Sequence, residues 1–133
     1  MILVDTSVWI DYFNGESTLH TDTLDSSLSE GVVLMGDLIF LEILQGFRDD
    51  KDFRKAKASI LTLEQHDMFS KDMVLSCANN YRSLRKAGTT IRSTADVIIG
   101  TFCIVNNLPL LFSDRDFLPF VNKLKMRSVL AGT

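Results

Sequence analysis

Short apolar runs alternate along the chain with longer segments whose apolar residues recur every three or four positions. Ile2-Leu3-Val4 form the first run, and helix-starting residues at 5–7 follow it. The same reading predicts strands at 2–4, 32–35 and 108–112, a candidate strand at 128–130, and helices at 8–13, 18–29, 37–44, 49–63, 70–86, 93–105 and 117–124. The chain is therefore expected to alternate strands with helices.

The apolar strands are too short and too uniform to show alternation between an inner and an outer face. Buried strands separated by helices are typical of an α/β protein, in which helices cover both faces of a parallel sheet. Each crossover returns the chain in the same direction, so the strand ends that lead into helices lie along one edge. Residues directly after the strands are expected to gather there.

Length and composition fit a single globular domain, 1–133. The chain has 133 residues, of which 46% are hydrophobic, enough for one core and too few for two. No charged leader followed by an apolar stretch opens it, and no apolar run approaches the roughly 20 residues of a membrane-spanning helix. We expect a soluble, cytoplasmic protein that does not associate with membranes.

The cysteines and histidines offer little for metal or nucleophilic chemistry. Cys77 and Cys103 each lie within a helical apolar pattern and at no close ligand spacing, so both are predicted to be buried thiols. His20 and His66 are far apart and have no partner at the spacing of a metal site or a catalytic triad. We assign no chemical role to these four residues.

Aspartates occupy the places where predicted helices begin. Asp5 follows the first strand, Asp114 and Asp116 follow the strand that ends at 112, and Asp96 lies in the first turn of the helix that Ser93 starts. Each has a simpler explanation as a helix cap, and Ser93 with Asp96 matches a capping box. Their shared position at one sheet edge is what suggests a site.

Glu42 is harder to explain as a structural residue. It lies within a helix that is apolar on nearly every side, and no lysine or arginine falls at helical spacing to pair with it. Burying an unpaired carboxylate costs several kcal/mol, so such a residue should be protonated or have a cation nearby. The alternative is that Glu42 lies at the rim of the helix and reaches water.

The formal charge of −3 argues against a general nucleic-acid binder, which normally carries a basic excess. Five of the 17 acidic side chains are Asp5, Glu42, Asp96, Asp114 and Asp116, and without them 12 acidic residues face 14 basic ones. Two bound divalent cations would bring the net charge to about +1. The composition is therefore compatible with a polyanionic substrate if these carboxylates bind metal.

A cluster of carboxylates needs a cation because the groups raise one another's pKa values. Oxygen ligands without cysteine or histidine suit Mg²⁺ or Mn²⁺. Such ions activate an attacking water and stabilise charge on a phosphate, so hydrolysis of a phosphodiester is the predicted chemistry.

Four motifs carry a resemblance to a known family: Val4-Asp5-Thr6-Ser7, Leu41-Glu42-Ile43-Leu44-Gln45-Gly46, Ile91-Arg92-Ser93-Thr94-Ala95-Asp96 and Phe112-Ser113-Asp114-Arg115-Asp116-Phe117. With these motifs in this order over essentially the whole chain, the sequence resembles PIN domains, specifically the VapC-type toxins of toxin–antitoxin pairs. Each motif alone is weak, and together they are specific.

The resemblance implies a three-layer α/β/α sandwich, an endoribonuclease dependent on Mg²⁺ or Mn²⁺, inhibition by a cognate VapB-type antitoxin, and a homodimer. It implies that metal is held, directly or through water, by Asp5, Asp96, Asp114 and Asp116. Glu42 would complete the catalytic site or position the attacking water. Thr6 and Ser93 would orient carboxylates or phosphate, or act only as caps. Whether Asp114 or Asp116 is the nearer ligand stays open.

RNA also requires positive side chains near the cut. Arg92 and Arg115 flank the acidic positions and are predicted to contact phosphates. Trp9, Tyr12 and Phe13 form an aromatic patch that is expected to be mostly core, with a part lining a dimer contact or an antitoxin groove.

Other families explain fewer of these residues. An α/β receiver or phosphatase would carry paired aspartates after the first strand, where this chain has Asp5-Thr6-Ser7. A Toprim-like nuclease would account for Asp114-Arg115-Asp116 and leave Glu42 and Asp96 unexplained. A PIN-like RNA-processing nuclease and a non-catalytic module that binds RNA or protein are the remaining alternatives.

Overall fold

A parallel sheet forms the centre of the computed structural model, which describes residues 1–130. Its strands are β1 (Ile2–Val4), β2 (Val33–Gly36), β3 (Glu64–His66) and β4 (Leu110–Leu111), in the order β3-β2-β1-β4. β1 lies between β2 and β4, with Leu3 opposite Leu34 and Val4 opposite Leu111. The carboxyl ends of β1 and β4 are therefore adjacent.

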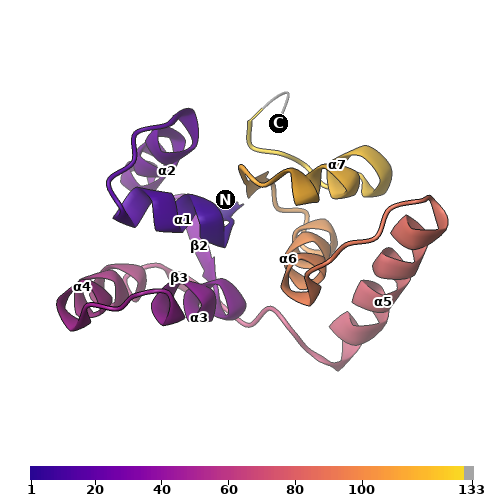
Figure 1. The fold of residues 1–133 in the computed structure, drawn as a ribbon, viewed down its shortest axis with the longest axis horizontal. Coiled ribbons are helices and arrows are strands. Elements are labelled where there is room, and N and C mark those ends of the chain that lie inside the picture. Colours follow the sequence, from indigo (N-terminus) through magenta and orange to yellow (C-terminus); the bar gives the residue numbers. More distant parts are fainter. Residues whose placement is uncertain (131–133) are drawn as a thin grey trace.

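Helices cover both faces of the sheet and confirm the α/β/α sandwich (Figure 1). They are α1 (Thr6–Phe13), α2 (Leu19–Glu30), α3 (Asp37–Gln45), α4 (Asp50–Ile60), α5 (Lys71–Lys86), α6 (Thr94–Val105), the 3₁₀ turn η1 (Arg115–Phe117) and α7 (Leu118–Leu124). Helices α1 to α4 lie on one side in Figure 1, and α5, α6 and α7 lie on the other. α1 packs on α2 and α3, whereas α5 packs on α6 and α7.

The core is the sheet together with the inner faces of these helices. The side chains of Leu3, Val4 and Leu111 are completely buried, as expected for strands covered on both faces. Trp9 stacks on Phe13 with ring centroids 5.7 Å apart and is buried, so the aromatic patch of α1 is partly core. Both cysteines are buried free thiols, as predicted.

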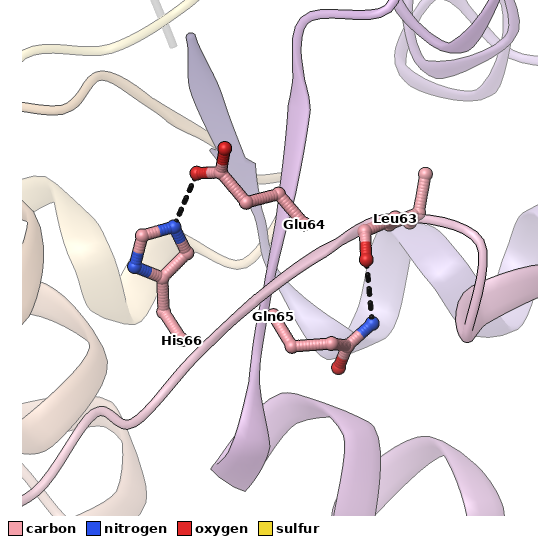
Figure 2. Close-up of polar contacts among 4 residues, drawn as sticks. All are labelled: Leu63, Glu64, Gln65 and His66. Atoms are coloured by element: carbon pink, nitrogen blue, oxygen red, sulfur yellow. Dashed lines mark hydrogen bonds and ion pairs between the residues drawn. The ribbon is translucent and has the colours of Figure 1, made fainter.

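The predicted helix at 49–63 is wrong in its last turn. α4 ends at Ile60, and after a short turn the chain enters β3, which pairs with β2 through Leu34 opposite Glu64. Figure 2 shows the side chain of Gln65 folding back, and its Nε2 donates hydrogen bonds to the carbonyls of Leu63 (3.1 Å) and Ile60 (2.9 Å). β3 lies at the edge of the sheet, where polar side chains are tolerated.

The strand predicted at 108–112 is shorter than expected, because only Leu110–Leu111 form the ladder. The candidate strand at 128–130 contributes one isolated bridge, between Leu110 and Ser128, and is not a strand. Among the residues described, no helix has both the length and the apolar character needed to cross a bilayer.

Candidate metal centre

Asp5 and Asp114 occupy the carboxyl ends of neighbouring strands. Asp5 follows β1 and caps α1, and its backbone N–H donates to the carbonyl of Leu111 in β4 (2.9 Å). Asp114 follows β4 and caps η1, where its Oδ1 accepts the N–H of Asp116 (2.9 Å). Both aspartates are thus helix caps, and the same backbone geometry brings them to one edge of the sheet.

Asp96 joins this edge from the first turn of α6, a helix that packs against η1. One carboxylate oxygen each of Asp96, Asp114 and Asp116 lie within 4.8 Å of one another. Asp96 is partly buried, whereas Asp114 and Asp116 are exposed. These residues form a cluster that opens to solvent on one side.

The pKa of Asp96 is raised by its burial and by the other carboxylates. Its pKa is raised to about 7, first by burial and then by the negative charges of Asp5, Asp114, Glu42 and Asp116. The other four carboxylates therefore lie within electrostatic reach of Asp96, although they come from distant parts of the chain. A positive charge among them would remove this repulsion.

Asp5 is the most buried of the five carboxylates, with 4% of its surface exposed, and it is not among the three whose oxygens lie within 4.8 Å of one another. Burial raises its pKa, and hydrogen bonds from the side chain and backbone of Ser7 oppose that shift. Ser7 Oγ donates to Asp5 Oδ2 at 2.7 Å. The carboxylate is therefore held in a fixed orientation.

Glu42 faces the cluster from α3, but it is not a buried, unpaired carboxylate. Its side chain is partly exposed, and Thr6 Oγ1 donates to its Oε1 at 2.7 Å. This position agrees with the alternative in which Glu42 lies at the rim of its helix and reaches water, and the first turn of α1 supplies a hydrogen-bond donor as well. No sequence periodicity indicates this contact, because 36 residues separate the two side chains.

Ser93, Arg92 and Arg115 were predicted to lie beside the carboxylates, and the structure gives the serine a capping role and leaves the arginines exposed. Ser93 Oγ accepts the N–H of Asp96 at 3.3 Å and so caps α6. Arg92 and Arg115 are exposed, the first just before α6 and the second within η1. Arg115 lies between Asp114 and Asp116 in sequence, and Arg92 lies four residues before Asp96.

Ser7 and Ser113 are site residues that the sequence analysis did not identify. Their Oγ atoms lie 3.5 Å apart, and Ser7 also donates to Asp5. In the sequence both serines look like ordinary residues at helix starts. Nothing in the sequence pattern distinguishes them.

The donor set suits a hard divalent cation. The cluster offers carboxylate oxygens from several elements and no thiol or imidazole. A shared cation would also offset the repulsion that raises the pKa of Asp96. The residues present therefore fit Mg²⁺ or Mn²⁺.

Comparisons with known proteins agree with this architecture. Residues 2–120 match the family model described as PIN domain. The chain is 30% identical over 119 residues to VapC ribonuclease Mb1587 of Mycobacterium bovis, covering 88% of this chain and 89% of that protein. The same identity and coverage relate it to ribonuclease VapC11 of Mycobacterium tuberculosis.

Solved structures share the fold at lower sequence identity. A crystal structure of VapBC2 from Rickettsia felis bound to a DNA fragment from their promoter contains a chain with a TM-score of 0.74 and 17% identity, covering 90% of this chain and 93% of that one. A chain of FitAcB from Neisseria gonorrhoeae has a TM-score of 0.72 and 19% identity, covering 91% and 94%. On its family-model match and its relatives, this chain belongs to the PIN domain family.

Proposed function

We propose that this protein is an endoribonuclease dependent on Mg²⁺ or Mn²⁺ that acts in the cytoplasm as the toxin of a toxin–antitoxin pair. The observation that carries the proposal is the convergence of the carboxylates, with oxygens of Asp96, Asp114 and Asp116 within 4.8 Å. The relatives named VapC ribonuclease supply the reaction class, which is hydrolysis of RNA. The electrostatic coupling of Asp96 to Asp5 and Glu42 adds two more acidic groups to the same site.

The five carboxylates have two roles in this proposal: four bind the cation and one acts on the attacking water. Asp5, Asp96, Asp114 and Asp116 would hold the cation, either directly or through water. A bound Mg²⁺ or Mn²⁺ lowers the pKa of an attacking water and stabilises charge on the phosphate. Glu42, fixed by its hydrogen bond from Thr6, orients that water and accepts its proton.

The exposed arginines bind the substrate. Arg92 precedes α6 and Arg115 lies between Asp114 and Asp116, so both can reach phosphates on either side of the cut. Their charges offset the repulsion between the RNA backbone and a protein of net charge −3.

RNA cleavage tests the proposal directly. We expect the wild type to cut single-stranded RNA in Mg²⁺ or Mn²⁺, EDTA to stop the reaction, and Asp5→Asn to lower the rate by at least about 100-fold because a buried ligand loses its charge. Glu30→Gln is the matched control, since it neutralises an exposed carboxylate at the end of α2, outside the cluster. Cleavage that persists in EDTA, or in Asp5→Asn at the wild-type rate, would contradict the metal-dependent mechanism.

We propose that the antitoxin binds in a groove between the end of α1, residues 46–49 and α4. The groove has a volume of about 630 Å³ and is lined by Phe13, Asn14, Gly46, Phe47, Arg48, Asp49, Asp52, Lys55, Ala56 and Ser59. Phe13 and Phe47 are in contact, with ring centroids 5.8 Å apart, and both are partly exposed. Apolar rings flanked by charges of both signs suit a peptide segment. Phe47→Ala should weaken the complex with the antitoxin and leave RNA cleavage unchanged.

We also propose a homodimer that uses an apolar hollow between α3 and α6. The hollow has a volume of about 380 Å³ and is lined by Asp37, Leu38, Leu41, Phe69 and Ile98. Leu41 and Phe69 are 57% and 51% exposed, which is unusual for large apolar side chains so close together. Analytical ultracentrifugation should give a dimer for the wild type and a monomer for Leu41→Ser with Phe69→Ser. A monomeric wild type would exclude this contact.

A further inference from the structure

Two successive hydroxyls in the first turn of α1 bind two different carboxylates. Thr6 Oγ1 donates to Glu42 on α3, and Ser7 Oγ donates to Asp5 at the end of β1, each at 2.7 Å. Both acceptors belong to the proposed metal centre. α1 therefore orients carboxylates from two separate elements.

Ser7 holds one particular oxygen of Asp5. Its Oγ lies 2.7 Å and its backbone N lies 3.4 Å from the same atom, Oδ2. The N–H contact is long and therefore weak, so the hydroxyl supplies most of the restraint. Because both contacts of Ser7 are to Oδ2, they leave Oδ1 available to a cation.

Ser113 extends the contact to the neighbouring strand. Its Oγ lies 3.5 Å from Ser7 Oγ, and Ser113 is the residue before Asp114. A hydroxyl has a single proton, and an ionised carboxylate only accepts hydrogen bonds, so the proton of Ser7 points to Asp5. Ser113 is then the donor to Ser7, and at 3.5 Å this contact is weaker than the 2.7 Å bond from Ser7 to Asp5.

We propose that Ser7, supported by Ser113, is a positioning residue that orients the Asp5 carboxylate for metal binding and fixes its place beside Asp114. The inference rests on the proposed metal-dependent function and deepens it. Hydrogen-bond partners of metal ligands typically change metal affinity or activity by about 10- to 100-fold when they are removed. Ser7 is such a partner, because it donates a hydrogen bond to Asp5, the proposed metal ligand, and would not contact the ion itself.

Mn²⁺ binding to the full chain, measured by isothermal titration calorimetry, tests this role without relying on activity. Ser7→Ala is expected to raise the Kd for Mn²⁺ by about 10- to 100-fold, and Ser7→Thr, which keeps a hydroxyl, should restore affinity close to that of the wild type. Ser113→Ala should act in the same direction with a smaller effect. Because Ser113 is exposed, this variant should fold normally even if Ser7→Ala is poorly folded.

Thr6→Val is the matched control in the same turn. It removes the hydrogen bond to Glu42, so it should lower the rate of RNA cleavage and leave the Kd for Mn²⁺ within about twofold of the wild type, since Glu42 is proposed to orient water rather than to hold the ion. In a double-mutant cycle, Ser7→Ala should add little to the loss caused by Asp5→Asn.

The outcomes separate this inference from the proposed function. Wild-type affinity in both Ser7→Ala and Ser113→Ala, or fully additive losses in the cycle with Asp5→Asn, would overturn the positioning role alone. A wild-type chain that neither binds Mn²⁺ nor cuts RNA would overturn the proposed function and this inference together.

Discussion

The charge of Asp96 depends on its burial and on its acidic neighbours. Its pKa in the folded protein is raised to about 7, from an ordinary value of 3.8, because it is partly buried and lies near other carboxylates. Below pH ~4 the group is protonated in both folded and unfolded chains and costs nothing. As the pH rises toward 7 the unfolded chain loses this proton while the folded one keeps it, so stability falls through that window and the loss is complete above pH ~7.

The resulting prediction concerns the metal-free protein. In EDTA, the melting temperature should be lower at pH 8 than at pH 5, and Asp96→Asn should make this dependence clearly shallower because the amide does not titrate. Circular dichroism melts across this pH range provide the measurement. Glu30→Gln should retain the wild-type slope, since this residue is outside the cluster. If Asp96→Asn melts with the wild-type pH dependence, the repulsion arises elsewhere.

The sequence predicted the positions of those carboxylates that the backbone topology determines. Asp5 and Asp114 follow parallel strands, and the geometry of such a sheet brings those positions to one edge whatever the details of packing. The family resemblance named Thr6 as a residue that orients carboxylates, but the acceptor of each hydroxyl was not predictable, since it depends on side-chain rotamers. Thr6 and Ser7 are consecutive and chemically alike, yet they donate to acceptors on different elements.

At the scale of elements, Gly100 allows α6 to lie close to α7. A Cβ built at Gly100 would lie 2.6 Å from two carbons of the Phe120 ring, and that ring is completely buried. Gly100→Ala would gain about 1 kcal/mol of helix propensity, but overpacking of this kind typically costs 1–3 kcal/mol. The clash cannot relax easily, because the buried Phe120 ring is surrounded by other side chains and cannot move out into solvent.

We therefore expect Gly100→Ala to lower the free energy of unfolding by up to about 2 kcal/mol, which is the overpacking cost less the gain in helix propensity. It should also reduce cleavage, because α6 carries Asp96. Urea unfolding measures the first effect and an RNA cleavage assay the second. A smaller side chain at the contact, Phe120→Leu, should recover part of the loss in the double variant. Gly46→Ala is the control, since its Cβ would be 3.4 Å from the nearest atom. Equal effects of both alanines would contradict the packing argument.

β3 shows where the sequence pattern was insufficient. Glu64, Gln65 and His66 have no apolar character, and the apolar residues before them continued the helical pattern of α4. They form a strand because β2 offers an unpaired edge, to which three residues add in register. This is a tertiary effect, and the exposed, polar strand that results carries no periodic signal.

At the scale of the whole molecule, metal binding should couple to stability. A cation that binds the folded chain and not the unfolded one stabilises it by about 2.7 kcal/mol at a concentration 100 times its Kd. At pH 8, Mg²⁺ should therefore raise the melting temperature by several degrees, and the effect should shrink below pH ~7 as Asp96 takes up a proton. Asp5→Asn should show little of this stabilisation. An equal rise in NaCl of the same ionic strength would indicate general screening instead.

The net charge of the molecule makes one further prediction about RNA. A protein of formal charge −3 cannot attract RNA through its overall field, so local cations must provide the phosphate contacts. Each contact with single-stranded RNA contributes a slope of about −0.7 to the dependence of log affinity on log salt. Replacing both Arg92 and Arg115 with alanine should therefore make that slope shallower by about 1.4.

The measurement is kcat/KM for a short RNA at several KCl concentrations and constant Mg²⁺. Arg54→Ala with Lys57→Ala removes two exposed charges from α4 and is the matched control, since those residues are not part of the carboxylate cluster. The control should keep the wild-type slope even if its absolute rate changes. A slope that stays at the wild-type value without Arg92 and Arg115 would mean that neither arginine binds a phosphate, and other cations would then have to hold the RNA over the carboxylates.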